Sequence, residues 1–492
     1  MSKKIGIIGS GFAGLSAATA LATAGNDVHI FEKNDAIGGR ARKFETNGFS
    51  FDMGPSWYWM PDVFEKYFER YGHKVSDFYQ LKKLDPGFTM VFDKNEAMDI
   101  PADFEAICAL FEKEEKGSAK QLRQFMTEAE YKYQKGINDL VYKPGLSLSE
   151  FADISLVKDV FRLQLFSSFS KHIRKYFKSP KLLALMEFPV LFLGAMPEKT
   201  PALYSLMNYA GLKQGTYYPM GGFNEVIKAM EKVAKKAGVK IYTSEAVTQL
   251  DVNQKKVSYI QANGHSMEVD AVIGAADYHH VEQSLLESQY RNYSESYWAG
   301  RTFAPSCLIY YLGVNKKVPR LQHHTLFFDN NLQQHSKEIY IDKKWPTKPL
   351  FYACCPSKTD PSTAAEGTEN LFLLMPIAPG LKDEEATREK YFDIMMDRLE
   401  EYIGTRIRDN FIYKKSYCVS NFVSDYNAYK GNAYGLANTL NQTAILKPKI
   451  KSKKLANLYF TGQLTVPGPG VPPSLISGQV VAKELNKYLE SL

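Results

Sequence analysis

Cysteine is scarce in this sequence, and its positions do not suit disulfides, redox exchange or metal binding. Five cysteines occur in 492 residues; three stand alone, and Cys354 and Cys355 are adjacent. There is no Cys-x-x-Cys pair, and no His, Cys and carboxylate residues occur at metal-ligand spacing. We therefore expect a reducing compartment, cysteines that serve as small packing residues, and no bound metal.

Long hydrophobic runs are also absent. The longest strongly apolar stretch, residues 188–196, is interrupted by Pro189 and is shorter than the roughly 20 residues that a membrane-spanning helix needs. Residues 1–4 lead directly into a strand-like run, so no signal peptide is expected. These features predict a cytoplasmic chain, or one attached peripherally to the cytoplasmic side of a membrane.

No strong charge of one sign is present either. The formal net charge is +7, and most lysines are dispersed along the chain. Because no nucleic-acid-binding motif accompanies the few lysine clusters, we expect no nucleic-acid partner. Mild basicity does suit an anionic membrane surface. The sequence also has no recognisable nucleophile elbow or catalytic triad.

The N-terminus carries a dinucleotide-binding pattern. An apolar run ending at Ile8 precedes Gly9-Ser10-Gly11-Phe12-Ala13-Gly14, and a helix-forming run follows. Gly9 permits a tight turn, Gly11 lets backbone N–H groups approach a pyrophosphate, and Gly14 allows the following helix to pack closely. The positive end of that helix dipole would face the phosphates.

Two further features indicate FAD. Glu32 ends the next apolar run, where a carboxylate accepts hydrogen bonds from a ribose and repels the 2′-phosphate of NADP. The turn Gly38-Gly39-Arg40 follows, and an arginine there can bind a diphosphate in a bidentate manner. Because ordinary nicotinamide dehydrogenases do not need this second turn, we expect a flavin.

The C-terminal segment contains a loop rich in proline and glycine. It reads Pro467-Gly468-Pro469-Gly470-Val471-Pro472-Pro473, and its small side-chain bulk would let a flat ring lie against the backbone. The prolines at 472 and 473 predict the start of a helix. The N-terminus of that helix would stabilise the negative charge that develops on a reduced isoalloxazine.

Dinucleotide-type strands occur in three separated pieces of the chain. We predict an α/β fold with a Rossmann-type FAD-binding domain assembled from residues 1–90, 217–290 and 451–492. The inserted α+β substrate-binding domain would comprise residues 91–216 and 291–450. Between 156 and 176, aromatic and apolar residues alternate with Lys and Arg. This pattern predicts a helix in a membrane interface or an ordinary core-facing helix with a solvated basic face.

These segments resemble the flavin-binding N-terminus of the amine oxidase and carotenoid desaturase superfamily, whose cofactor is FAD. The run from Thr465 to Pro472 is similar to the C-terminal signature of bacterial-type phytoene desaturases. Further similar segments follow in order, at 194–197, 218–222, 323–325, 359–367 and 431–436. The resemblance covers almost the whole chain and implies removal of hydrogen from adjacent saturated carbons of a carotenoid, with the hydride passing to the flavin.

The resemblance also implies a set of cofactor-binding residues, with Val247 contacting adenine through its backbone. Gln463 stands where many relatives carry a carboxylate; it can hydrogen-bond but supplies no charge, so backbone N–H contacts are expected at this turn. No catalytic acid or base is identified, because paired histidines such as His323 and His324 are more often structural. The predicted cofactor set is Gly9, Gly11, Phe12, Ala13, Gly14, Glu32, Lys33, Gly39, Arg40, Gly54, Pro55, Val247, Gly462, Gln463, Gly470, Val471 and Pro472.

Within this family, residues 431–436 and 465–478 are most similar to the 1-hydroxycarotenoid 3,4-desaturases, and phytoene desaturase is the alternative. A carotenoid oxidase or isomerase, a flavin amine oxidase and a non-catalytic lipid-binding module stay open. No second nucleotide-binding pattern, Cys-x-x-Cys relay or metal cluster offers a path for electrons. We therefore expect oxygen or a membrane quinone to reoxidise the flavin.

Overall fold

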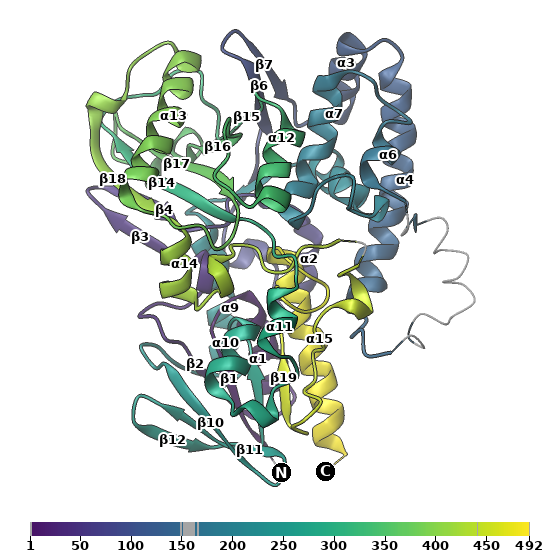
Figure 1. Ribbon diagram of the computed structural model, residues 1–492, viewed down its shortest axis with the longest axis vertical. Helices are drawn as coiled ribbons and strands as arrows, with labels where there is room; N and C mark the ends of the chain where they lie inside the picture. The colour runs from purple at the N-terminus through teal and green to yellow at the C-terminus, as the bar shows by residue number, and fades with distance from the viewer. Residues whose placement is uncertain (1, 148–149, 151–162, 165–166, 440, 492) are drawn as a thin grey trace.

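The computed structural model describes residues 2–147, 150, 163–164, 167–439 and 441–491. Figure 1 shows two lobes, with both termini at the lower end of the molecule. The lower lobe contains the N-terminal strand and helix and the C-terminal helix, whereas the upper lobe contains a large sheet beside a group of helices. This mixed α/β architecture confirms the coarse fold class predicted from the sequence.

A parallel five-stranded sheet organises the lower lobe, with the order β19-β13-β1-β2-β9. Ile7 of the central strand lies opposite Ile30 on one side and Ile273 on the other. These strands are short and mostly apolar because helices and a second sheet cover their two faces. Their bounds are β1 (Lys4–Ile8), β2 (Asp27–Phe31), β9 (Lys240–Tyr242), β13 (Ala271–Gly274) and β19 (Leu458–Phe460).

Helix α1 (Phe12–Thr23) is almost wholly buried, and it contacts both α9 (Phe223–Lys236) and α15 (Val471–Glu490). The crossing with α15 is close, because a Cβ at Gly478 would lie 2.3 Å from the carbonyl oxygen of Ala13. Ser16 Oγ also donates to the carbonyl of Leu475, at 2.8 Å. The first and last helices of the chain therefore form one packed unit (Figure 1).

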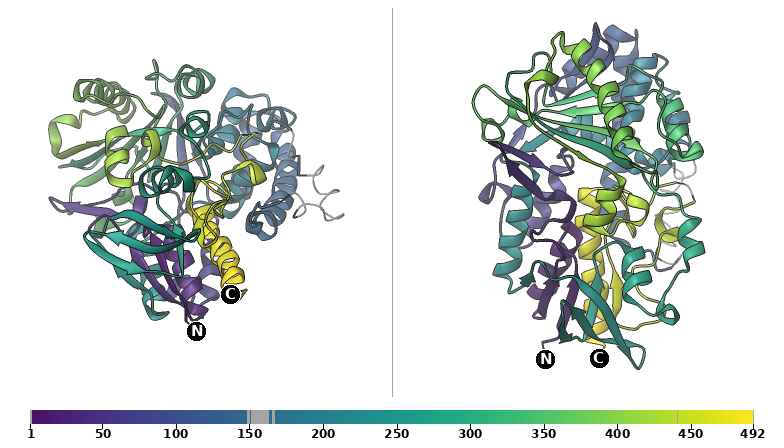
Figure 2. Two further views of the ribbon diagram at one scale, coloured as in Figure 1. Left: turned by 60° about the horizontal axis from the view of Figure 1, so that its bottom comes forward. Right: turned by 60° about the vertical axis from the view of Figure 1, so that its left-hand side comes forward.

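A seven-stranded sheet forms the core of the upper lobe, in the order β18-β14-β17-β16-β15-β6-β7. Every neighbouring pair is antiparallel except β15 and β6. Along β14, Leu308, Tyr310 and Leu312 pack with α13, while the alternate residues face the other way. The right-hand view in Figure 2 shows these long strands spanning the upper lobe. The bounds are β6 (Phe88–Asp93), β7 (Glu96–Ile100), β14 (Ser306–Val314), β15 (His324–Phe327), β16 (Phe351–Cys354), β17 (Glu369–Ile377), β18 (Phe411–Tyr417) and α13 (Glu385–Ile403).

The remaining elements surround these two sheets. A three-stranded antiparallel sheet lies beside the parallel one, because Ile260 of β11 contacts Gly6 of β1. The helices α3, α4, α6 and α7 stand together on one side of the upper lobe (Figure 1). The bounds are β3 (Lys43–Thr46), β4 (Phe49–Asp52), β5 (Leu81–Lys83), β8 (Tyr217–Pro219), β10 (Val247–Asn253), β11 (Lys256–Ala262), β12 (His265–Glu268), α2 (Pro61–Glu69), α3 (Phe104–Glu114), α4 (Ser118–Asn138), α6 (Phe169–Ile173), α7 (Pro180–Glu187), α8 (Leu206–Asn208), α10 (Tyr278–Leu285), α11 (Glu295–Ala299), α12 (Leu332–Lys337) and α14 (Val419–Tyr426).

The prediction of a continuous helix over residues 156–176 is wrong for the part of this segment that the structure describes. Residues 151–162 and 165–166 lie outside that part. Gln164 has a φ of 54°, and the following helix, α6, has five residues. Phe169 and Ile173 of α6 are buried in the core, so this segment uses its apolar side chains for packing. None of the described helices is long and apolar enough to cross a membrane.

Candidate functional site

The first glycine turn leaves open space above the N-terminus of α1. Gly9 has a φ of +102°, which only glycine adopts readily, and a Cβ at Gly14 would lie 2.1 Å from the Gly9 carbonyl oxygen. By contrast, a Cβ at Gly11 would meet no atom within 4 Å. The first-turn N–H groups, including those of Phe12 and Ala13, have no acceptor within the helix. The turn therefore offers unpaired donors beside an empty space of the kind that an anionic group fills.

The second glycine turn lies against the first. A Cβ at Gly39 would lie 3.3 Å from the Cα of Gly11. The partly buried Arg40 donates from one terminal nitrogen to the carbonyl of Asn432 at 3.1 Å, and its guanidinium lies 5.0 Å from the ring centre of Tyr426. Its Nε is buried and has no hydrogen-bond partner among the described residues. A buried unpaired donor on a cation is costly in isolation, so this atom indicates a missing anionic partner.

Glu32 is buried at the end of β2 and is already fully hydrogen-bonded. One carboxylate oxygen accepts from the Ser10 N–H at 3.0 Å and from Ser10 Oγ at 2.6 Å. The other accepts from the backbone and side-chain nitrogens of Asn34, both at 2.9 Å. The carboxylate thus lies beside the first glycine turn, where a ribose hydroxyl that binds Glu32 would replace one of these donors.

The other predicted residues follow the same edge of the sheet. Gly54 is in close contact with the second turn, since its Cβ would lie 2.6 Å from the Arg40 carbonyl oxygen, and Pro55 comes next in the chain. Val247 opens β10 and is nearly buried. The ammonium of Lys33 donates to the carbonyl of Ser424 in α14 and to Asn427 Oδ1 just after that helix, and its contact with the cofactor stays a prediction.

The C-terminal turn joins this group through Asn432. Gly462, with a φ of +107°, follows β19, and its N–H donates to Ser477 Oγ at 3.0 Å. This N–H is therefore engaged inside the protein, although backbone contacts to the cofactor were predicted for the turn. Gln463 Nε2 lies 3.4 Å from Asn432 Oδ1, and the carbonyl of that asparagine binds Arg40. Helix α15 begins at Val471 after Gly470, as the prolines predicted.

The geometry of these turns fits FAD. The pyrophosphate would occupy the space at Gly11 and pair with Arg40, and Glu32 would hold the ribose. Gly54, Gln463 and the start of α15 would line the flavin end, and Val247 the adenine end. The fit depends on two observations in the protein itself, the open space at Gly11 and the unpaired Nε of Arg40.

Asp52 stabilises the turn that begins α9. Its carboxylate accepts from the N–H groups of Phe223 at 2.8 Å and Asn224 at 3.3 Å. Burial is the dominant influence and raises the pKa of Asp52 to about 7. A raised pKa means that the folded state holds this proton more tightly than the unfolded chain does. The stabilising contribution is thus present at low pH and is lost as the pH rises toward 7.

We therefore expect Asp52→Asn to flatten the pH dependence of stability. From pH 5 to pH 7.5, deprotonation of Asp52 should cost the wild-type protein about 2 kcal/mol of unfolding free energy that the variant does not lose. Urea unfolding of both FAD-loaded proteins across this range measures the difference. Other titrating groups contribute equally to the two proteins, so parallel curves would contradict this role of Asp52.

His323 and His324 are adjacent buried histidines, and each is hydrogen-bonded through Nδ1 to a different residue. Nδ1 of His323 lies 2.8 Å from Thr359 Oγ1, and Nδ1 of His324 lies 2.6 Å from the Tyr352 hydroxyl. The His324 ring also stacks on Trp57, with 4.2 Å between centroids. Burial lowers the pKa of His323 to about 3 and that of His324 well below its usual value. Both rings are therefore neutral and weakly basic near pH 7, as expected of structural residues.

Cys354 lies opposite His324 across the β15–β16 pair. His323, His324 and Cys354 place one ligand atom each within 4.8 Å of one another, so these residues could hold a metal ion. The spacing in the sequence had not indicated this group. Ligands around a tetrahedral zinc ion lie only about 3.5 Å apart, and burial raises the pKa of the Cys354 thiol. The raised pKa favours the neutral thiol, and the absence of a metal stays a prediction.

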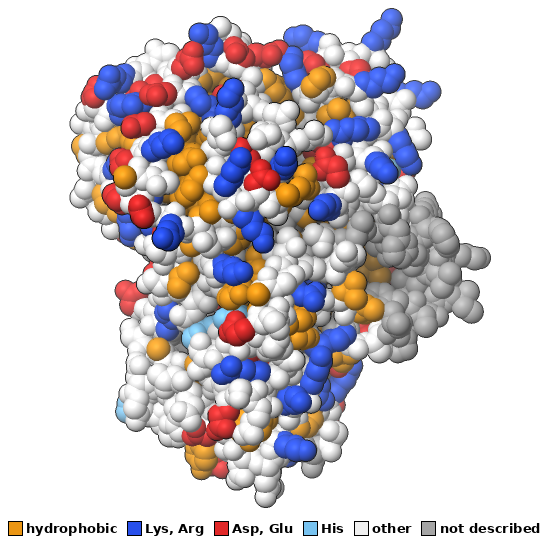
Figure 3. Space-filling model, in the orientation of Figure 1, with side chains coloured by type: hydrophobic (Ala, Val, Ile, Leu, Met, Phe, Trp, Pro, Cys, Tyr) orange, Lys and Arg blue, Asp and Glu red, His pale blue; other side chains and the backbone are white. Residues whose placement is uncertain are grey.

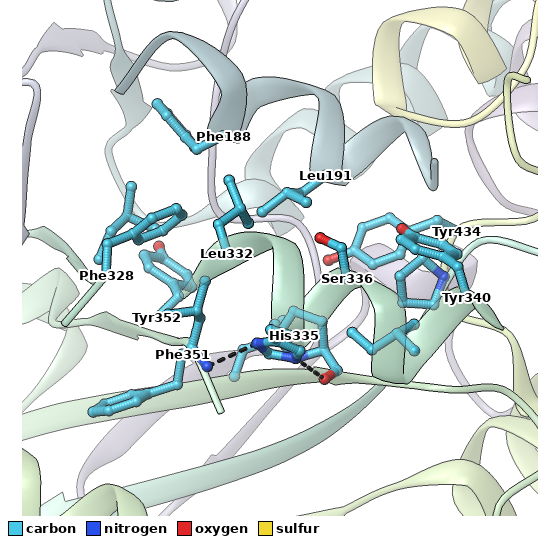
Figure 4. Close-up of a pocket in the computed structure, with 16 residues that line it drawn as sticks. Phe188, Leu191, Phe328, Leu332, His335, Ser336, Tyr340, Phe351, Tyr352 and Tyr434 are labelled. Atoms are coloured by element: carbon cyan, nitrogen blue, oxygen red, sulfur yellow. Dashed lines mark hydrogen bonds between the residues drawn. The ribbon is translucent and has the colours of Figure 1, made fainter. Parts of the chain in front are cut away.

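An apolar cavity of about 60 Å³ lies between the large sheet and the helices beside it (Figure 4). Strands β15, β16 and β17 form one wall, and α12 and the segment after α7 form another. The residues that line the cavity are Phe188, Leu191, Pro305, Leu326, Phe328, Leu332, His335, Ser336, Ile339, Tyr340, Leu350, Phe351, Tyr352, Leu374, Pro376 and Tyr434.

A comparison with known protein families identifies the type of enzyme. The family model described as "Flavin containing amine oxidoreductase" matches residues 12–486. The chain belongs to this family. Flavin is thus the cofactor, as the sequence predicted.

Curated relatives of this oxidoreductase act on carotenoids by name. It is 39% identical over 480 residues to the carotenoid 3,4-desaturase of Haloarcula japonica, and the match covers 97% of each chain. It is also 29% identical to a 4,4′-diapophytoene desaturase of Staphylococcus haemolyticus, over 99% of each chain. A zeta-carotene-forming phytoene desaturase of Myxococcus xanthus is 26% identical and is covered to 94%.

Solved structures of distant proteins share the fold of this oxidoreductase. An oxidoreductase from Methanosarcina mazei matches with a TM-score of 0.63 at 17% identity, over 98% of this chain and 100% of that one. A putrescine oxidase variant matches with a TM-score of 0.63 at 14% identity, over 99% of both chains. At these identities the likeness extends to the fold alone.

Several residues of the site could not be found from the sequence of the oxidoreductase. Asn432 and Tyr426 contact Arg40, which lies almost 400 residues earlier, and no local pattern marks them as partners. The similarity of residues 431–436 to a known family was the only signal at this position. Ser336 and Tyr340 of the cavity carry no motif at all.

Proposed function

We propose that this protein is an FAD-dependent carotenoid desaturase that forms a conjugated double bond near the 3,4 position of a carotenoid end. The observation that carries the proposal is the direct connection between the predicted flavin site and the apolar cavity. Two short stretches of chain make this connection. Residues 54–57 run from Gly54, beside Arg40, to Trp57, and residues 432–434 run from the Arg40 partner Asn432 to the cavity residue Tyr434.

Hydrogen bonds link the first of these stretches to the cavity wall. Ser56 Oγ lies 3.0 Å from the hydroxyl of Tyr352, which lines the cavity. Trp57 stacks on His324, and the same Tyr352 hydroxyl binds that histidine. The wall nearest the cofactor is therefore aromatic, as suits a hydrocarbon substrate.

When bound, FAD supplies the acceptor for a hydride from the substrate carbon. The protein's own residues bind and orient. Arg40 and the α1 N-terminus hold the diphosphate, and Glu32 holds the ribose. The aromatic and aliphatic side chains of the cavity exclude water and align the polyene. His335 does not take a proton readily, because its Nδ1 accepts from the Leu350 N–H and its Nε2 donates to the Pro376 carbonyl.

The cavity does not favour oxidation of amines. Burying a substrate ammonium without a carboxylate to pair with it is costly. The sixteen lining residues include no carboxylate. The walls thus suit an uncharged chain better than an amine.

The test is turnover of defined carotenoids by the purified FAD-loaded protein in lipid. Phytoene, lycopene and 1-hydroxylated carotenoids are supplied separately, and the red shift of absorption reports each new double bond. Without oxygen, the substrate should bleach the flavin once and then stop. A soluble quinone should restore turnover without NAD(P)H. A double bond that shifts or isomerises with no bleaching would overturn net oxidation.

We also propose that the protein binds membranes peripherally through the helical side of the upper lobe. In Figure 3, Lys and Arg side chains are frequent at the upper right, where Figure 1 places α3, α4, α6 and α7. Lys171 and Lys175, in and just after α6, are exposed. Arg174 is not a free cation, because it pairs with the buried Glu187.

Reversing both exposed charges should weaken membrane binding. Each lysine near an anionic surface contributes about 1 kcal/mol, so Lys171→Glu/Lys175→Glu should bind anionic vesicles roughly 30-fold less tightly. Co-sedimentation with vesicles of mixed anionic and neutral phospholipids measures this. The control is Lys232→Glu/Lys236→Glu, the same charge change at the same spacing on α9 in the lower lobe. Equal losses in both variants would show general electrostatics and contradict the proposed face.

A further inference from the structure

Two hydroxyl groups in the apolar cavity have no partner. Ser336 Oγ and the Tyr340 hydroxyl are both buried and make no hydrogen bond within the part of the chain that the structure describes. The Ser336 side chain is 2% exposed. Burial raises the pKa of Tyr340 above its usual value, so its phenol keeps its proton and remains a donor. Leaving such a group unpaired in an apolar site is energetically unfavourable.

The other polar atoms near these hydroxyls are already engaged. Both nitrogens of His335 are hydrogen-bonded to the backbone, and the Tyr352 hydroxyl binds His324 and Ser56. The Tyr434 hydroxyl accepts from Cys307 Sγ. The spare hydrogen-bonding capacity of this cavity is thus concentrated at Ser336 and Tyr340.

The local backbone brings these two side chains to one place. Ser336 lies in the last turn of α12, and Tyr340 lies four residues later in a π-helical turn, Glu338–Asp342. Residues four apart share a face of a helix, and π-turns inside helices recur at functional sites. Figure 4 shows Ser336 and Tyr340 toward one end of the pocket, with Phe328 and Phe351 toward the other.

The size of the cavity matches the end of a substrate. A water-sized group needs about 10–15 Å³ of such volume, so about 60 Å³ holds roughly four or five heavy atoms. A tertiary carbinol, a carbon that carries two methyl groups and a hydroxyl, has four. Its methyl groups would contact the apolar wall, and its hydroxyl could both accept and donate.

We propose that Ser336 and Tyr340 select a carotenoid whose end carries a hydroxyl group, by binding that hydroxyl inside the apolar cavity. This inference rests on the proposed desaturase function and adds the residues that decide between hydroxylated and hydrocarbon substrates. A hydrocarbon end would leave both protein hydroxyls unpaired, and a site built in this way discriminates strongly against such an analogue.

The experiment compares kcat/KM for a 1-hydroxylated carotenoid and for the matching hydrocarbon. In the FAD-loaded wild type, the hydroxylated substrate should be preferred. Ser336→Ala and Tyr340→Phe should each lower its kcat/KM about 10-fold, and the double variant by more, with little change for the hydrocarbon. Thermal stability should not fall, because each variant removes an unpaired buried hydroxyl. Tyr310→Phe is the matched control: its hydroxyl is also buried and unpaired, but it packs against α13 outside the cavity.

The possible results distinguish a failure of substrate selection by Ser336 and Tyr340 from a failure of the proposed desaturase function. Equal losses on both substrates, or no loss on either, would overturn the selection by Ser336 and Tyr340 while leaving the desaturase function intact. If the wild type desaturates no carotenoid, the proposed function fails. Binding of the same two carotenoids, followed by their induced circular dichroism, then still tests the selection. Unchanged relative affinities in the double variant would overturn it.

Discussion

Gly11→Val should abolish FAD binding without unfolding the protein. The backbone at this position has a φ of −72°, which valine adopts without strain, and a Cβ would contact no protein atom within 4 Å. The added methyl groups would instead occupy the space expected for the pyrophosphate. We expect at least about a 100-fold loss of FAD affinity, or roughly 3 kcal/mol. Flavin absorbance after gel filtration and titration calorimetry measure this loss.

Two further variants make this result specific. Gly11→Ala should give an intermediate loss, because its single methyl fills less of the space. Ala24→Val adds similar bulk at the exposed opposite end of α1 and should leave FAD affinity unchanged. Far-UV circular dichroism of the flavin-free proteins should be identical. Full FAD occupancy in Gly11→Val would show that the pyrophosphate lies elsewhere.

Leu332→Asp should stop carotenoid turnover while the flavin stays bound. Leu332 is half-buried at the cavity, so a carboxylate there can reach solvent in the free enzyme and folding should survive. A hydrocarbon chain in the cavity would cover that charge, and burying an unpaired carboxylate costs several kcal/mol. We expect kcat/KM to fall about 100-fold or more. Steady-state desaturation in lipid, with flavin content measured in parallel, provides the comparison.

The neighbouring position supplies the control for this variant. Gln333→Asp introduces the same charge one residue later, at an exposed site that does not line the cavity. Its turnover should stay within a few-fold of wild type. If Leu332→Asp also remains active, the substrate does not enter this cavity, and the cavity should be regarded as a packing defect.

Local backbone requirements explain what could be predicted from the sequence. Gly9 is required by its positive φ, and Gly14 is required because a Cβ there would lie 2.1 Å from the Gly9 carbonyl oxygen. Such requirements are visible in the sequence as glycines. The start of α15 at Val471 was predictable because prolines mark first helical turns. In each case the signal and the structure that it specifies are only a few residues apart.

Long-range partners explain what could not be predicted. Arg40 was predicted to bind a diphosphate. Its hydrogen bond to the carbonyl of Asn432, almost 400 residues later in the chain, was not expected. The prediction of one helix over residues 156–176 was wrong in the part of the segment that the structure describes. Alternating basic and apolar residues do not reveal which side chains the surrounding structure buries. The group formed by the two histidines and Cys354 depends on strand pairing that spacing alone does not reveal.

The packing of α1 against α15 has a consequence for how the chain is made. Ser16 and its hydrogen-bond partner Leu475 are 459 residues apart. At the usual pace of about 5–20 residues per second, the ribosome needs roughly 20 to 90 s to synthesise that interval. Throughout this time the apolar side of α1 lacks its final cover. A chain that ends before Gly478 would never cover this part of α1, and we expect such a product to expose apolar surface and to aggregate.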